Sequence, residues 1–162
     1  MDFFDIAMQI EKEGEDYYTK LAEECSGNEG MNHIFKMLAR DEKKHYAIFK
    51  KMKENNPPDF QKTDIFESAK EIFTEFRKQF DKLSCDMSQL ETYKKALELE
   101  KKSYDFYLEK LDEFTDPIHM GIIRKIANEE KKHMLLLENI IEMVERPETW
   151  IEDAEFVHLE DY

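Results

Sequence analysis

The 162-residue sequence has few residues that turn or stop a chain, with only four glycines and four prolines. An all-β domain needs many turn residues, so this shortage favours long amphipathic helices and an all-α fold. No apolar run approaches membrane-spanning length, and the N-terminal MDFFDIAMQI has neither a basic region nor a small-residue cleavage site. We therefore expect a cytoplasmic protein without a membrane partner.

Positive charge is also in short supply. There are 38 acidic residues against 24 Lys and Arg, which gives a formal net charge of −14 at pH 7. Nucleic acids and anionic membranes need a basic stripe that meets their phosphates, and no such stripe stands out in this sequence. We therefore expect neither kind of partner.

Cysteine is nearly absent as well. Cys25 and Cys85 are the only two cysteines, and they are too few for a four-thiolate metal site and too far apart for a Cys-x-x-Cys motif. In a sequence without secretory features, we expect both thiols to stay reduced.

Apolar periodicity and helix-stopping residues predict four main helices and one accessory helix. We expect them at about residues 2–24, 29–54, 64–83 (accessory), 88–115 and 116–146. Pro57 and Pro58 end the second helix, Ser88-Gln-Leu-Glu91 reads as a capping box, and Asp116-Pro117 starts the last helix. Residues 1–146 then form one helical domain, and the tail 147–162 packs on it through Trp150 and Phe156.

An internal repeat relates the two halves of the chain. Residues 7–18 (AMQIEKEGEDYY) match 96–107 (ALELEKKSYDFY), and residues 34–45 (IFKMLARDEKKH) match 122–133 (IIRKIANEEKKH). The first two main helices therefore correspond to the last two. This predicts a four-helix bundle of two related helical hairpins, joined by a long crossover that contains the accessory helix.

The repeat carries a Glu-x-x-His motif in each half, and each motif interrupts an apolar helical stripe. The predicted cluster has six members, namely Glu11, Glu42, His45, Glu100, Glu130 and His133. The two residues of each motif are three positions apart and share one helix face, while Glu11 and Glu100 lie on the stripes of the other two main helices. All these polar positions fall near mid-helix, so antiparallel packing brings them to one level of the bundle.

Four carboxylates in a core are costly unless cations neutralise them. Two divalent or trivalent cations would do so and would use both imidazoles as donors. Oxygen and imidazole ligands without thiolate suit iron, with manganese as second choice. Zinc prefers four tetrahedral ligands, so some of the carboxylates would remain uncoordinated. The alternative is a metal-free bundle with buried Glu–His salt bridges.

The sequence gives weaker support for a role at the metal site to the other polar residues near the stripes. Tyr18 and Tyr107 follow Glu11 and Glu100 by two turns, so they are placed either to hydrogen-bond ligand carboxylates across the bundle or simply to pack. Glu15 is a weak candidate for a further ligand, with a solvated surface residue as the alternative. Among the remaining histidines, we expect surface positions for His33 and His158 and core or rim packing for His119.

This pattern resembles the ferritin-like di-iron carboxylate superfamily and, within it, the rubrerythrin-like proteins. The resemblance covers most of the chain and implies two iron ions that cycle between diferrous and diferric states while hydrogen peroxide or dioxygen is reduced to water. It also implies that Glu11 and Glu100 are terminal ligands, that each Glu-x-x-His motif supplies two more, and that Glu42 and Glu130 bridge the two ions.

The chain departs from the rubrerythrin pattern at two points. It lacks the four cysteines of a rubredoxin-like iron domain, so electrons would come from a separate carrier such as a rubredoxin. It also has Ser103 where rubrerythrins have a further carboxylate, one turn after the third-helix ligand. A second hypothesis is therefore a metal-handling protein that binds or oxidises ferrous iron without peroxidase turnover. For either function we expect a homodimer, as ferritin-like bundles often pair.

Overall fold

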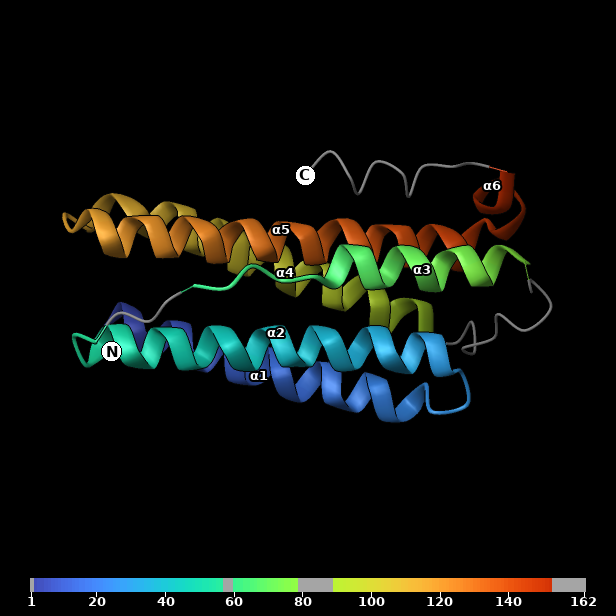
Figure 1. Cartoon of the computed structure of the whole chain (residues 1–162), viewed down its shortest axis with the longest axis horizontal. Helices are drawn as coiled ribbons and strands as arrows, with labels where there is room; N and C mark the ends of the chain where they lie inside the picture. Colours follow the sequence, from blue (N-terminus) through green and yellow to red (C-terminus); the bar gives the residue numbers. More distant parts are fainter. Residues whose placement is uncertain (1, 57–59, 79–88, 153–162) are drawn as a thin grey trace.

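The computed structural model describes residues 2–56, 60–78 and 89–152, with residues 151 and 152 as backbone only, and it is built from helices (Figure 1). The prediction of an all-α fold is confirmed, since no strand occurs in these ranges. The elements in chain order are α1 (Phe3–Glu24), α2 (Glu29–Lys53), α3 (Ile65–Lys78), α4 (Leu90–Lys110), the short 3₁₀ helix η3 (Leu111–Glu113), α5 (Pro117–Glu145) and α6 (Pro147–Glu152).

Side-chain caps start three of the main helices, because the first backbone N–H groups of a helix have no partner within it. Asp2 accepts from the N–H of Asp5 at 2.9 Å, and Asn28 accepts from the N–H of Met31 at 3.1 Å. Asp116 caps α5 directly before its first residue, a proline, as the sequence predicted. The expected capping box at Ser88 and the expected accessory-helix residues 79–83 lie outside the described residues.

Two antiparallel hairpins make the bundle. α1 and α2 form the first and α4 and α5 the second, while residues 60–64 of the crossover and α3 lie alongside α2 and α5 (Figure 1). A Cβ added to Gly30 would come within 2.6 Å of the ring of Phe76, so only glycine allows α3 to approach the first turn of α2 this closely. The crossover thereby covers one side of the bundle.

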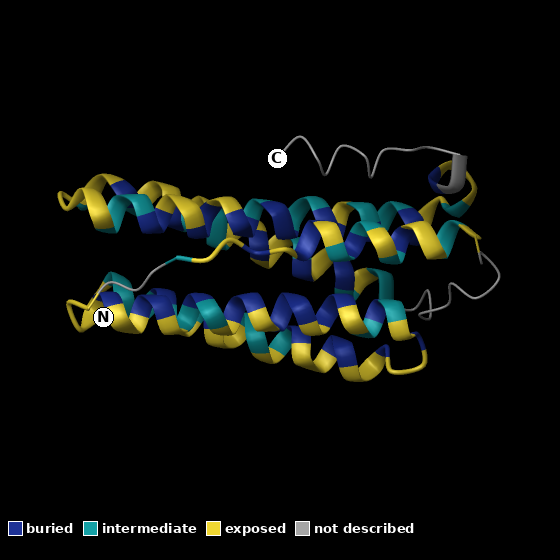
Figure 2. Cartoon of the chain, viewed as in Figure 1, coloured by how far each residue is buried: buried dark blue, intermediate teal, exposed yellow. Residues whose placement is uncertain are grey.

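Buried residues lie on the inner sides of the helices (Figure 2). The apolar ones among them form two core clusters, one toward each end of the bundle. The first surrounds Phe35 and Tyr93, and the second surrounds Phe49 and Tyr107. The predicted Glu and His residues occupy the level between the two clusters, and all six are buried. The amphipathic pattern therefore places a polar layer inside the bundle.

The described part of the C-terminal tail is the short helix α6. Trp150 is buried there, donates from Nε1 to Asn139 Oδ1 at 2.5 Å and meets Phe73 edge-on, with ring centroids 5.9 Å apart. Phe156 and His158, for which the sequence predicted an anchor and a surface residue, lie outside the described residues. Among the described helices, none has both the length and the hydropathy to cross a membrane.

Candidate metal centre

Six buried side chains from all four bundle helices meet at mid-length. They form two groups in which one ligand atom from each residue lies within 4.8 Å of the others. The two groups are Glu11, Glu42, His45 and Glu130, and Glu42, Glu100, Glu130 and His133. Glu42 and Glu130 belong to both groups. The structure thus brings together all six residues predicted as ligands and gives the two motif glutamates a shared position.

The two imidazoles point the same ring nitrogen at the cluster. His45 Nδ1 lies 3.0 Å from Glu130 Oε1, and His133 Nδ1 lies 3.2 Å from both Glu42 Oε1 and Glu100 Oε1. The rings are 22° from parallel with centroids 6.2 Å apart. Nδ1 is therefore the nitrogen that each histidine can offer to a cation.

The other nitrogen of each histidine meets a carboxylate that sequence reasoning missed. His45 Nε2 lies 2.7 Å from Glu129 Oε1, and His133 Nε2 lies 2.9 Å from Asp41 Oδ2. Carboxylates in this position fix the tautomer with the proton on Nε2, orient the ring and make Nδ1 a better ligand. The signal was present in the repeat, where an acidic residue precedes the motif glutamate in both copies.

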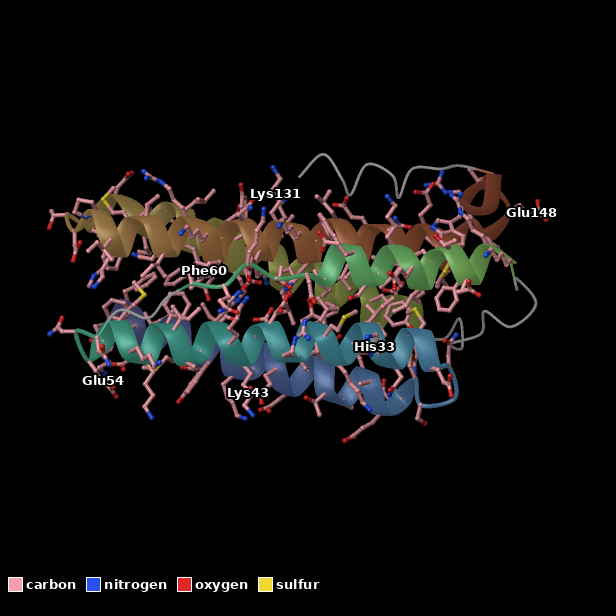
Figure 3. The ribbon with its side chains drawn as sticks, viewed as in Figure 1. His33, Lys43, Glu54, Phe60, Lys131 and Glu148 are labelled. Carbon is pink, nitrogen blue, oxygen red and sulfur yellow. The ribbon has the colours of Figure 1, made fainter. Side chains whose placement is uncertain are left out.

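A single residue of the crossover binds both of these carboxylates. The Thr63 hydroxyl donates to Asp41 Oδ2 at 2.6 Å, and the Thr63 backbone N–H donates to Glu129 Oε2 at 2.7 Å. Lys44 adds an ion pair to Glu129 at 3.0 Å. Phe60 lies between the hairpins on the same face, with the ammonium groups of Lys44 and Lys125 5.2 and 5.7 Å from its ring centroid (Figure 3). Nothing in the sequence marked Thr63 as part of the site.

The two predicted tyrosines hydrogen-bond the terminal glutamates across the bundle. Tyr18 of α1 donates to Glu100 Oε1 of α4 at 2.5 Å, and Tyr107 of α4 donates to Glu11 Oε1 of α1 at 2.7 Å. Both tyrosines are buried. Each hairpin therefore orients a carboxylate of the other, which is the arrangement that the repeat suggested.

Crowding of the carboxylates shifts the ionisation of the cluster. Burial and the neighbouring carboxylates of Glu100, Glu11 and Glu130 raise the pKa of Glu42 well above its usual value. Burial and Glu130 raise the pKa of Glu100 to about 7, although His133 opposes them. Without a cation, protons thus neutralise part of the negative charge.

The pKa values of both histidines and of Glu11 are shifted by contacts within the same cluster. Burial lowers the pKa of His45, but Glu11 together with Glu129 and Glu130 outweighs burial, and the pKa rises well above its usual value. The pKa of His133 rises for the same reason, through Glu100 and Asp41. Burial raises the pKa of Glu11, but His45 and the hydrogen bonds of the cluster lower it overall.

The chemistry of the cluster fits a pair of cations. In the described part of the chain, three buried carboxylate oxygens of the cluster, Glu11 Oε2, Glu100 Oε2 and Glu130 Oε2, accept no hydrogen bond. Nδ1 of His45 lies 3.5 Å from Glu11 Oε2, and Nδ1 of His133 lies 3.7 Å from Glu130 Oε2. Buried acceptors without donors are rare in native proteins and point to an ion or water. Oxygen and imidazole donors without thiolate suit iron or manganese.

The weaker candidates lie elsewhere. Glu15 is partly exposed, 3.7 Å from Lys12, and belongs to neither ligand group. His33 is exposed on α2, and His119 packs edge-on against Phe4 and Phe114 at the rim of the second core cluster (Figure 3 labels His33).

Cys25 also lies outside the ligand groups. Cys25 is buried, with Sγ 3.4 Å from the Tyr93 hydroxyl, in the core cluster around Phe35. Cys85 lies outside the described residues, so the expectation of two reduced thiols stays a prediction.

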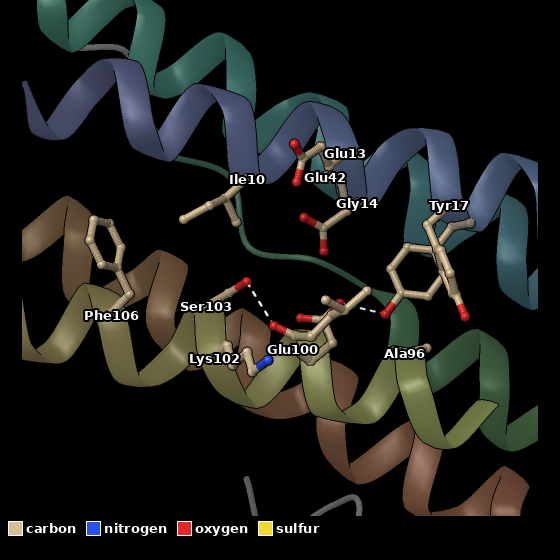
Figure 4. Close-up of a pocket in the computed structure, with 12 residues that line it drawn as sticks. Ile10, Glu13, Gly14, Tyr17, Glu42, Ala96, Glu100, Lys102, Ser103 and Phe106 are labelled. Carbon is tan, nitrogen blue, oxygen red and sulfur yellow. Dashed lines mark hydrogen bonds between the residues drawn. The ribbon is translucent and has the colours of Figure 1, made fainter. Parts of the chain in front are cut away.

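A cavity of about 370 Å³ lies between α1 and α4 and reaches the cluster at Glu42 and Glu100 (Figure 4). Gly14 of α1 forms part of its wall, and a Cβ at that position would come 3.0 Å from Glu42 Oε2. Ser103 lines the opposite wall, where its hydroxyl donates to the Leu99 carbonyl within α4. The cluster is thus closed on the α2–α5 side and open toward a cavity on the α1–α4 side.

A family model described as Rubrerythrin matches residues 2–141 of the chain. The chain belongs to the rubrerythrin family. The matched range begins before α1 and ends within α5, so it contains all six residues of the cluster and the whole crossover. The resemblance stated from the motifs is confirmed at the level of the family. Comparisons with curated proteins and with solved structures found no match.

Proposed function

We propose that this protein is a di-iron oxidoreductase of rubrerythrin type, which reduces hydrogen peroxide or dioxygen with electrons from a separate carrier. The observation that carries the proposal is the pair of overlapping ligand groups that share Glu42 and Glu130. Membership of the rubrerythrin family supports it. Two metal positions that share carboxylates suit a reaction in which two electrons leave together.

The six residues divide into two ligand sets with shared members. Glu11 and His45 would hold one iron, Glu100 and His133 the other, and Glu42 and Glu130 would be common to both. When bound, the iron pair supplies redox chemistry, with two electrons for an O–O bond. The manganese ion is the second choice of metal, since it accepts the same ligands.

The protein's own part is to orient ligands and to control access. Glu129 and Asp41 fix the imidazoles, while Tyr18 and Tyr107 fix Glu100 and Glu11. The oxidant reaches the cluster through the cavity between α1 and α4, on the side away from the histidine Nε2 atoms. Reduction of peroxide to two waters also consumes two protons, and the same cavity connects the site to solvent.

Metal loading followed by oxidant tests the proposal. We expect two irons per chain after anaerobic loading with ferrous iron, and repeated peroxide turnover when a reduced one-electron carrier is supplied. Glu100→Ala should bind fewer ions, whereas Glu15→Ala, a matched control outside the cluster, should still bind two. Fewer than two metals per chain, unchanged in Glu100→Ala, would contradict the proposal.

The second candidate is an iron-handling protein of ferroxidase type. The net charge of −14, which attracts cations, and the small number of cysteines favour it. Slow stoichiometric oxidation of ferrous iron, with no acceleration by an added electron donor, would support this candidate over the first. Metal analysis of the protein as purified identifies the ion, and sedimentation tests the proposed homodimer.

A further inference from the structure

The cavity between α1 and α4 is much larger than the oxidants of the proposed function require. A water molecule takes up about 30 Å³ of liquid, so hydrogen peroxide needs roughly twice that volume. The cavity measures about 370 Å³ and would stay mostly unfilled with either peroxide or dioxygen at the cluster. Its volume suits a small organic molecule, in the range of known ligand sites.

The lining of this cavity is mainly apolar above its floor, although the charged residues Glu13 and Lys102 also line it. Ile10 of α1 and Leu99 and Phe106 of α4 contribute apolar wall, and the carboxylates of Glu42 and Glu100 form the floor (Figure 4). Leu99 is 41% exposed and lies at the cavity. A ligand with an apolar body and a small polar head matches this distribution.

Two small residues create the space beside the floor. Gly14 and Ser103 occupy equivalent positions in the repeat, each one turn after a terminal glutamate, and both line the cavity. Neither side chain reaches the cluster, since glycine has none and the serine hydroxyl bonds within its own helix. The repeat thus leaves both walls open at the same level.

We propose that this cavity is a binding site for organic hydroperoxides, an inference that rests on the proposed function. The apolar group lies against Ile10, Leu99 and Phe106, and the hydroperoxide head lies at Glu42 and Glu100. The reaction is ROOH + 2 e⁻ + 2 H⁺ → ROH + H₂O, in which the O–O bond breaks and each oxygen gains a proton from solvent. A metal pair held by the six ligand residues would supply the two electrons, and the one-electron carrier would replace them.

Binding can be tested without turnover, using the product alcohol. We expect 2-phenyl-2-propanol, the alcohol from cumene hydroperoxide, to bind saturably to protein loaded with diamagnetic zinc and to shift the amide resonances of Gly14 and Ser103. Ser103→Phe fills the cavity from a partly exposed position and should weaken binding at least about tenfold. Leu108→Phe, at an exposed α4 position that does not line the cavity, is the control. Absence of saturable binding to the wild type would overturn the inference.

Turnover supplies an independent test. Ser103→Phe should lower the ratio of kcat/KM for cumene hydroperoxide to kcat/KM for hydrogen peroxide by roughly tenfold. Leu99→Trp, at the exposed mouth, should lower the same ratio and is the second variant if Ser103→Phe does not fold. An unchanged ratio in a folded variant overturns the inference.

The outcomes separate this inference from the proposed function. Reduction of hydrogen peroxide without alcohol binding leaves the function standing and overturns the organic site. Alcohol binding without reduction of either peroxide overturns the proposed function and, with it, hydroperoxide reduction. A dimer that buries Leu99 and excludes the alcohol, detected by sedimentation, also overturns the inference.

Discussion

The two faces of the metal centre differ in almost every physical respect. On the α2–α5 face, both histidine Nε2 atoms meet carboxylates, and Thr63 of the crossover binds both carboxylates. On the α1–α4 face, a cavity reaches Glu42 and Glu100, and one oxygen of Glu100 accepts no hydrogen bond among the described residues. The α2–α5 face is a polar network whose groups are hydrogen-bonded, and the α1–α4 face has an acceptor without a donor among the described residues.

This difference indicates that the two faces have different roles. Fully satisfied buried networks are rigid and hold their members in one geometry, which suits groups that orient ligands. Unsatisfied acceptors beside a cavity suit exchange of ions and small molecules. The closed face therefore fixes the candidate ligand side chains, and under the proposed function the open face would receive the oxidant.

The largest effect is expected where the two faces meet, at a carboxylate common to both ligand groups. Glu130→Ala removes a shared ligand, so we expect metal content to fall from two ions per chain to below one. Glu100 belongs to only one ligand group, so Glu100→Ala should retain more metal than Glu130→Ala. Elemental analysis after dialysis measures both, and equal losses in the two variants would contradict the shared position.

A change of pH probes the crowded carboxylates without mutation. The pKa of Glu100 is raised from 4.5 to about 7, so the folded metal-free protein binds more protons than the unfolded chain between these values. Stability of the metal-free protein should therefore fall as pH rises through this window, by about 3 kcal/mol from this group alone. The raised pKa of Glu42 acts in the same direction.

The histidines extend this trend to higher pH. Their raised pKa values contribute stability that is complete below the unfolded value of 6.5 and is lost as pH rises through the folded values. Glu11, Asp41 and Glu129 have lowered pKa values, so their contributions change only below pH 4.5. Urea unfolding at pH 5 and pH 8, with and without metal, checks the sign. Metal-free protein that is more stable at pH 8 would contradict it.

Thr63→Val tests whether the closed face fixes the ligands. The variant keeps the backbone bond to Glu129 but leaves Asp41 without its hydroxyl donor, which should cost about 1–3 kcal/mol. Through Asp41 and His133 it should also weaken metal binding, by about tenfold. Competition with a chelator measures the affinity. Thr63→Ser restores the donor and should behave like the wild type, and equal weakening in both variants would exclude the hydroxyl as the cause.

Gly14→Ala, on the open face, should have the smallest effect. We expect it to raise the stability of the metal-free protein and to lower the metal affinity. Alanine favours the α1 helix over glycine by about 1 kcal/mol, which should stabilise the metal-free protein. Its Cβ would lie 3.0 Å from Glu42 Oε2, so the carboxylate must move by a few tenths of an ångström. We expect metal affinity to fall a few-fold, and Gly121→Ala, where a Cβ meets nothing within 4 Å, is the control. Unchanged affinity would show that Glu42 adapts freely.

Much of the fold was predictable because local patterns and global packing agree in this chain. Asp116-Pro117 marked the start of α5, and the alternation of three and four residues marked the buried side of each helix, including Phe35 and Leu137. The six cluster residues were also predictable, since the repeat displays each of three ligand positions twice. Periodicity reveals residues that project from a helix stripe.

Asp41 and Glu129 could not be predicted from periodicity, although the repeat has an acidic residue at this position in both copies, and nothing in the sequence marked Thr63. Asp41 and Glu129 lie beside the stripe, where an acidic residue ordinarily faces solvent, and they are buried only because the crossover covers them. The path of the crossover depends on packing between segments far apart in sequence, such as the approach of α3 to Gly30. The cavity likewise depends on the spacing of two helices, which the small size of Gly14 and Ser103 suggests only in retrospect.

The crossing hydrogen bonds between the hairpins have a consequence for the order of folding. Each hairpin is closed by a short turn and is rich in local contacts, which form fast, whereas docking of the two hairpins must close the long crossover. Tyr18, Tyr107 and the Nε2 atoms of both histidines find their hydrogen-bond partners in the opposite hairpin. We therefore expect helix content to appear early in refolding and metal uptake to follow the slowest phase, so that the ion reports when the two halves have met.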